Sequence, residues 1–151
     1  MKKIIFVLIL LCLSSCSSFK GKTPNRNLQE ALVRVSADYL RHVVTGNAAA
    51  ASAMIDWDKY RTKNGGAYSR TIYANEMQKL VNTYPTKEAK QHPLLLLDLK
   101  SVKTKKDLAQ VILQKTDRSA KEVKIYFQWV GRGWVIIDDS IFGPGGTVRS
   151  S

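Results

Sequence analysis

Hydrophobic positions in the first half of the chain recur at helical spacing. From an N-capping asparagine, Asn25 or Asn27, to Gly46, the apolar side chains fall three or four residues apart. Glycine is common just beyond a helix end. The pattern predicts one long amphipathic helix, whose buried stripe consists of Leu28, Leu32, Val35, Tyr39 and Val43.

Two further helices are expected before the middle of the chain. Asn47 can cap a short helix through the alanine-rich residues 48–55, and residues 56–58 are expected to end it. A turn at residues 63–66 separates it from a third helix over residues 69–84, which Pro85 terminates.

The second half of the chain changes to the period of two that is typical of β-strands. The clearest strand covers residues 123–129, and a tight turn at residues 131–133 joins it to a last strand over 134–141. Two earlier strands are expected at residues 94–103 and 107–116. Three helices before four strands predict an α+β fold, with the helices packed on one face of a curved antiparallel sheet.

The first fifteen residues have a different pattern. Lys2 and Lys3 precede an apolar run over residues 4–13, and two serines follow. A positive start, a short apolar core and small residues before a cleavage point are the parts of a secretory signal. The run is shorter than the roughly 20 residues that a membrane-spanning helix needs.

The stretch Leu13-Ser14-Ser15-Cys16 ends this run and resembles the lipobox of bacterial lipoproteins. The resemblance implies cleavage between Ser15 and Cys16, a diacylglycerol on the Cys16 thiol and, usually, an acylated new amino group. Two or more acyl chains anchor a protein stably, whereas one holds it only marginally. Ser17 stands where an aspartate would often signal inner-membrane retention, so the outer membrane, facing the periplasm, is favoured. The alternative is an ordinary secretory signal cut near Ser15 or Ser18.

Cysteine usage and charge narrow the function classes. Cys12 would leave with the signal and Cys16 would become a thioether, so no thiol remains for a disulfide, a nucleophile or a metal site. Without Lys2 and Lys3 the basic count falls from 24 to 22 against 12 acidic residues, a net charge of +10. In the envelope this charge points to anionic lipid, lipopolysaccharide or an acidic partner protein rather than to nucleic acid. The alternative is a solvated basic surface with no dedicated partner.

The order of elements carries a second resemblance. An amphipathic helix ending at Gly46-Asn47, an alanine-rich second helix and the hairpin over residues 129–139 are similar to the nuclear transport factor 2-like superfamily, a cone of curved sheet around helices. This implies room for a pocket at the open end of the cone. The superfamily includes enzymes and binding modules, so fold does not give function. The expected parts are a signal peptide over residues 1–15, a lipidated flexible tether over 16–27, one domain over 28–142 and a flexible tail over 143–151.

Few residues suggest chemistry. His42 and His92 have no ligand spacing, and no phosphate loop, nucleophile motif or zinc pattern occurs, so neither a metal nor a cofactor is expected. Asp138 and Asp139 are neighbours on a strand, so their side chains point to opposite faces and cannot share a proton. One of them could face into the cone with a raised pKa and act as a base, as in some isomerases and dehydratases of the superfamily. The tryptophans are expected as core or pocket-wall residues; they are Trp57, Trp129 and Trp134.

A group of lysines marks the turn between the first two strands. It is either a solvated hairpin tip, which discourages edge pairing, or a contact with phosphate-bearing lipid or an acidic partner. The leading hypothesis is a lipid-anchored, non-enzymatic envelope protein that serves as a binding or assembly module. The alternatives are a cone that binds a small apolar ligand such as a lipid, and a pocket enzyme of the isomerase or dehydratase type. The lysines are Lys100, Lys103, Lys105 and Lys106.

Overall fold

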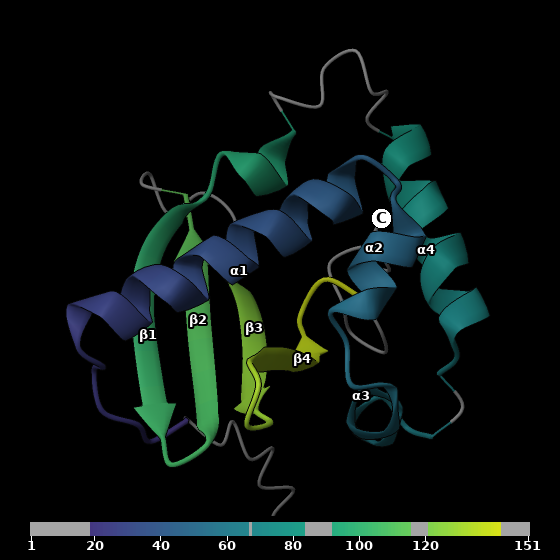
Figure 1. Cartoon of the computed structure of the whole chain (residues 1–151). Coiled ribbons are helices and arrows are strands. Elements are labelled where there is room, and N and C mark those ends of the chain that lie inside the picture. Colours follow the sequence, from purple (N-terminus) through teal and green to yellow (C-terminus); the bar gives the residue numbers. More distant parts are fainter. Residues whose placement is uncertain (1–18, 67, 84–91, 116–120, 143–151) are drawn as a thin grey trace, which may run out of the picture.

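The structure is a computed structural model that describes residues 19–66, 68–83, 92–115 and 121–142. Within these residues, four α-helices and a short 3-10 helix precede four strands (Figure 1), which confirms the predicted α+β class. The helices are α1 (Arg26–Val44), α2 (Ala48–Ala53), α3 (Trp57–Lys63), α4 (Arg70–Thr83) and the 3-10 helix η2 (Pro93–Leu95), and the strands are β1 (Asp98–Lys105), β2 (Leu108–Gln114), β3 (Val123–Trp129) and β4 (Trp134–Asp139).

Side-chain caps set the helix boundaries. The side chains of Asn25 and Asn47 accept hydrogen bonds from backbone amides in the first turns of α1 and α2, as predicted. The prediction that residues 56–58 end the second helix is wrong. The Asp56 side chain accepts a hydrogen bond from the amide of Lys59 and begins α3, a helix that the expected count of three omits.

The sheet is an antiparallel meander in the order β1-β2-β3-β4. On β3 the predicted alternation holds for Val123, Ile125 and Phe127, which are all buried. The first strand begins later than predicted, because the apolar residues that follow Pro93 form part of the 3-10 helix η2. The strand β1 begins at Asp98. Proline suits the first position of a helix, since its φ is already close to the helical value.

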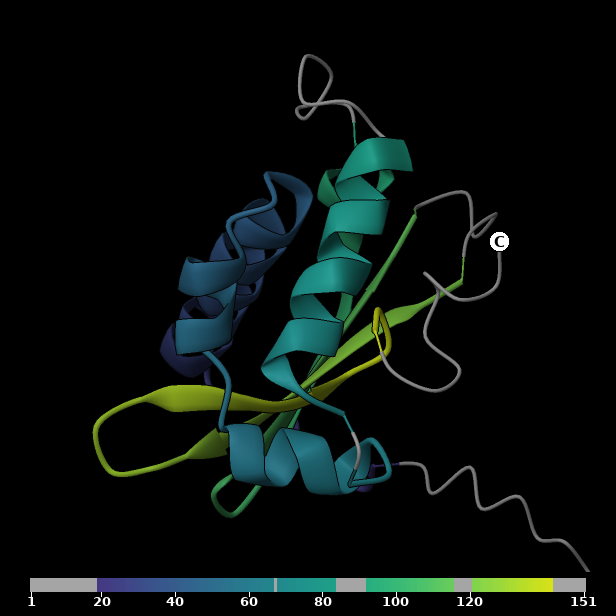
Figure 2. The same cartoon turned by 90° about the vertical axis from the view of Figure 1, so that its right-hand side faces the viewer.

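The helices and the sheet enclose one core. Figures 1 and 2 show α1 crossing the sheet over β1 and β2, α2 and α4 beside it, and α3 below, packed against β4. In Figure 1, β4 runs across the direction of the first three strands, so the sheet bends strongly at its last strand. The register of the β3–β4 pair shifts between Tyr126 and Phe127, and such bulges bend a sheet locally.

The segment before α1 lies against the sheet. A flexible tether is predicted over residues 16–27, yet Lys22 forms an antiparallel bridge with Thr104 near the end of β1. The amide of Lys22 donates to the Thr104 carbonyl oxygen over 2.8 Å, and the amide of Thr104 donates to the Lys22 carbonyl oxygen over 2.7 Å. From Phe19 onward, the chain therefore differs from the predicted tether.

Four sequence-based predictions lie outside the described residues. They concern the signal over residues 1–15, Cys16, Pro85 and the tail over 143–151. In the part of the chain that the structure describes, no helix combines the length and the apolar character of a membrane span.

Candidate functional site

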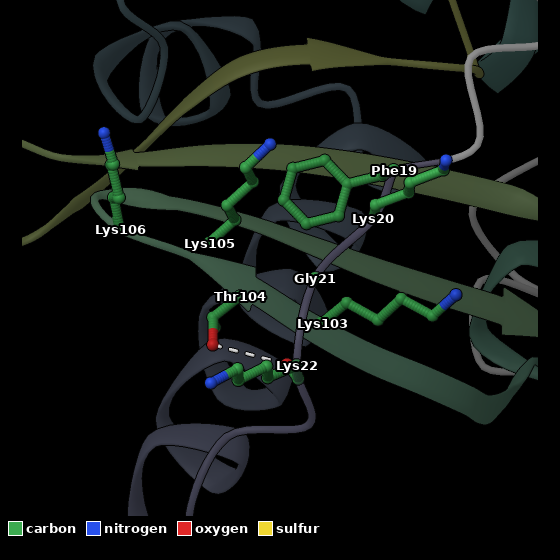
Figure 3. A pocket seen from close by; sticks show the side chains of 8 residues that line it. All are labelled: Phe19, Lys20, Gly21, Lys22, Lys103, Thr104, Lys105 and Lys106. Atoms are coloured by element: carbon green, nitrogen blue, oxygen red, sulfur yellow. Dashed lines mark hydrogen bonds between the residues drawn. The ribbon is translucent and has the colours of Figure 1, made fainter.

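A hollow lined by lysines opens where the N-terminal segment crosses the end of β1 (Figure 3). Its volume is about 740 Å³, and no acidic side chain is among the described residues that line it. Figure 3 shows the lysine amines spread around the site rather than gathered at one point, as suits several separate anionic groups. This lysine hollow is lined by Phe19, Lys20, Gly21, Lys22, Lys103, Thr104, Lys105 and Lys106.

The N-terminal segment approaches β1 so closely that position 21 requires glycine. A Cβ on Gly21 would lie 2.8 Å from the Thr104 carbonyl oxygen and 2.8 Å from the Phe19 ring, and both distances are shorter than a Cβ contact in a folded protein. The Thr104 hydroxyl also donates to the Lys22 carbonyl oxygen over 3.4 Å. These contacts hold Lys20 and Lys22 beside the lysines of β1.

The turn between β1 and β2 holds a lysine in an unfavourable backbone conformation. It has two residues, Lys106 and Asp107. The φ of Lys106 is 56°, in the left-handed region that favours glycine, and no other non-glycine residue among those described has a positive φ. This conformation costs a non-glycine residue about 1–2 kcal/mol. Because such strain concentrates at functional sites, Lys106 is a candidate functional residue.

A second hollow, of about 700 Å³, adjoins the lysine hollow and shares Lys20 and Lys105 with it. Asp138 lines this second hollow. Burial and the neighbouring Asp139 carboxylate raise the pKa of Asp138 to about 6, and a hydrogen bond from Asn64 over 3.4 Å opposes this rise. Asp138 is thus the accessible member of the acidic pair.

Asp139 points into the core, so the two aspartates face opposite ways as the strand alternation predicts. Its Oδ2 accepts hydrogen bonds from the hydroxyls of Tyr39 and Tyr60, both over 2.8 Å. Its Oδ1 accepts from the amides of Ile141 and Phe142 over 2.7 and 3.0 Å. All four groups are donors, which suits an ionised carboxylate. Burial still raises the pKa of Asp139, and these four hydrogen bonds limit the rise.

Tyrosines extend this buried polar network. The hydroxyl of Tyr73 donates to that of Tyr39 over 2.9 Å, and the hydroxyl of Tyr68 donates to the Glu76 carboxylate. Burial, together with the Asp139 charge, raises the pKa of Tyr39 well above its ordinary value, so this phenol stays a donor. Through Tyr39, Tyr60 and Tyr73, the hydrogen bonds around Asp139 join α1, α3, α4 and β4 inside the core.

The two histidines lie in separate elements. His92 is buried, its Nδ1 accepts a hydrogen bond from the amide of Leu94 over 3.1 Å, and burial lowers its pKa. His42 is half-buried on α1. Among the described residues, no three His, Cys, Asp or Glu side chains form a group that could hold a metal ion.

The structure divides the predicted lysine cluster. Lys100 pairs with Glu122 and lies outside the lysine hollow, whereas the other three predicted lysines line it. Lys20 and Lys22 were not predicted to join them, because nothing in the pattern of residues 19–22 indicates a bridge to a strand. Their position four and six residues after Cys16 predicts that they lie close to the lipid head groups, but it does not indicate the contact with β1.

One of the tryptophans departs from its predicted environment. Trp57 is half-buried and its ring contacts Tyr60 and Tyr73, as expected for a core residue. Trp134 also packs against the core. Trp129, however, is 44% exposed, so the expectation of a core or pocket-wall position is wrong for it.

No protein-family model matches this sequence, and no curated protein or solved structure matches it either.

Proposed function

We propose that this chain is a lipid-anchored protein of the bacterial envelope, attached through Cys16, and that its lysine hollow binds the phosphate groups of an anionic membrane surface. In this role the domain is a non-enzymatic binding or assembly module. The outer membrane, on its periplasmic face, is the proposed location. The domain itself is proposed to be a nuclear transport factor 2-like cone, which the helix-covered, bent sheet supports.

One observation carries the proposal: five lysines, and no acidic side chain, are among the described residues that line a hollow just after the predicted anchor. Three residues span at most about 11 Å, so Phe19 must stay within that distance of an acylated Cys16. Lys20 and Lys22 follow directly and are held against β1. An anchor at Cys16 therefore brings this end of the domain to the lipid head groups.

The electrostatic contribution is large enough to matter. A lysine near an anionic leaflet contributes about 1 kcal/mol, and the attraction fades within a Debye length, about 8 Å in physiological salt. Only lysines at the anchored end stay within this range. The hollow thus supplements the acyl chains and orients the domain.

Binding of a small apolar ligand and pocket catalysis have less support. On the inner face of β4, the buried Tyr39 and Tyr60 rings are hydrogen-bonded to the Asp139 carboxylate, so these side chains fill the core rather than line a pocket for an apolar ligand. All four hydrogen bonds to the Asp139 carboxylate come from side chains and amides of the core. This aspartate is therefore a core brace, a group that holds the surrounding elements together. Asp138 is accessible, but the described groups that hydrogen-bond to its carboxylate are the Asn64 side chain and the Asp139 backbone, and neither is an acid or a base.

The test uses the chain from residue 16 onward with Cys16→Ser, which carries no acyl chain. Its binding to vesicles of phosphatidylcholine, with and without phosphatidylglycerol, is measured by co-sedimentation. The double variant Lys105→Gln/Lys106→Gln should bind the anionic vesicles about 25-fold more weakly, from about 1 kcal/mol for each lysine.

The matched control is Arg34→Gln/Lys79→Gln, which removes the same charge from exposed positions on α1 and α4. It should change binding little. Equal losses of vesicle binding in the two double variants would show that binding depends on net charge alone. That result would refute a role for the lysine hollow. Lipopolysaccharide micelles, tested in parallel, separate the two sources of phosphate.

A further inference from the structure

The turn between β3 and β4 exposes apolar side chains to solvent. Trp129 is 44% exposed and Val130 is 47% exposed. The Trp129 and Trp134 rings lie edge to face, with centroids 5.5 Å apart, so each ring restrains the other. Gly131, with φ of 81°, and the exposed Arg132 complete the turn.

This turn lies at the same end of the sheet as the lysine hollow. Leu108 pairs with Gln128, so the β1–β2 turn and the end of β3 are neighbours. The amide of Trp129 donates to the Asp107 carbonyl oxygen over 2.7 Å, and the Gln128 side chain donates to the Asp107 carboxylate over 2.7 Å. Asp107 is thus adjacent in sequence to Lys106 and bonded to the β3–β4 turn. Figure 1 shows the two turns at the lower end of the sheet, and in Figure 2 the β3–β4 turn extends to the left of the β1–β2 turn.

The residue types at this end match the border between lipid head groups and acyl chains. Tryptophan is enriched at that border, where its ring is buried and its N–H stays hydrated, and basic side chains suit the phosphate layer. A single exposed apolar residue needs no explanation. Here, two adjacent exposed apolar residues lie beside the lysine hollow. The other exposed large apolar residues among those described lie on other elements or at the far end of β1; they are Ile72, Leu96 and Leu99.

We infer that the turn from Trp129 to Trp134 is a second membrane contact, which enters the head-group region of an anionic bilayer beside the lysine hollow. The inference rests on the proposed anchor at Cys16, which brings this end of the domain to the membrane. Tethering raises the effective concentration of the turn at the bilayer, so a weak contact suffices. Anchor and turn together hold the domain in one orientation.

The experiment places a fluorophore in the turn. Val130→Cys in the full chain is labelled with the environment-sensitive dye NBD, and the acylated protein is reconstituted in vesicles of phosphatidylcholine and phosphatidylglycerol. Lipids that carry a doxyl quencher in the upper acyl chain then report contact. Leu96→Cys is the control: Leu96 is 53% exposed but precedes the opposite end of β1. We expect a blue shift and quenching for the label at 130, and neither for the label at 96.

A label at 130 that stays unshifted and unquenched in vesicles to which the protein is bound would overturn the inference. So would a blue shift that depends on protein concentration without vesicles, because the turn would then contact a second copy of the chain. Flotation of the same samples separates the two proposals. Protein that floats with the vesicles but has an unquenched label at 130 retains its anchor and lacks the second contact, whereas protein that does not float has no anchor.

A second variant keeps the test independent of labelling. Trp129→Ser in the acyl-free chain should reduce binding to anionic vesicles by at least as much as the loss of one lysine, about fivefold. Leu96→Ser should leave binding unchanged. Equal binding of the two serine variants would contradict the inference even if the lysine hollow proved essential.

Discussion

The amide of Trp129 donates a hydrogen bond of 2.7 Å to the carbonyl oxygen of Asp107, and this bond joins the two hairpin turns of the sheet. A strained lysine and an exposed tryptophan are thereby placed at one end of the domain. The N-terminal segment reaches the same end through Lys22 and Thr104. The lysines, the exposed tryptophan and the segment that follows the proposed anchor therefore lie at one end of the sheet.

Lys106→Gly should stabilise the fold and weaken membrane binding. Glycine adopts the φ of 56° without strain, but it also gives the unfolded chain more conformational entropy. The net effect should be a free energy of unfolding that is higher by about 0.5–1 kcal/mol. The lost charge should reduce binding to anionic vesicles about fivefold. Urea unfolding and vesicle co-sedimentation measure the two effects. A variant that is stabilised yet binds normally would remove Lys106 from the site.

Asp139→Asn should destabilise the fold by about 2–3 kcal/mol, as expected for buried hydrogen bonds to a charged acceptor. An amide cannot accept from four donors, so at least one of Tyr39, Tyr60 and the two backbone amides would face another donor. Urea unfolding at pH 7 checks this, with Asp138→Asn as the matched neighbour on the outer side of β4. Equal stabilities of the two asparagine variants would contradict the role of Asp139 as a core brace.

The pKa of Asp138 predicts a pH-dependent difference between the natural chain and Asp138→Asn. Its folded pKa of about 6 exceeds the ordinary value near 4, so the folded protein binds this proton more tightly than the unfolded chain does. Asp138 therefore stabilises the fold most below pH 4, and this contribution is lost as pH rises through 6. Relative to the natural chain, Asp138→Asn should gain stability between pH 4 and pH 7 in urea unfolding. A constant difference across that range would show that the carboxyl is not perturbed.

Local patterns predicted those elements that have caps or a long periodicity. Asn25 and Gly46 bracket α1, and alternation identifies β3. The sequence did not reveal α3, because seven residues are too few to display a helical stripe and Asp56 resembles a helix end as much as a cap. The apolar run at residues 94–97 was misassigned for a related reason: a short apolar run does not distinguish a strand from a helical turn.

The candidate site was predicted only where neighbours in sequence are neighbours in space. Alternation on β4 correctly places Asp138 and Asp139 on opposite faces. That Tyr39, 100 residues away, would donate to Asp139 depends on where α1 and β4 lie around the shared core, which no local pattern encodes. The approach of Lys20 and Lys22 to β1 depends in the same way on long-range backbone pairing.

The anchor at Cys16 is tested most directly by metabolic labelling with a fatty-acid probe, comparing the natural chain with Cys16→Ser. We predict that the natural chain takes up the label and is cut before residue 16, and that the serine variant remains unlabelled and unprocessed. Labelling that persists in Cys16→Ser, or a natural chain that stays unlabelled, would contradict the anchor and, with it, the assignment of the lysine hollow to the membrane surface.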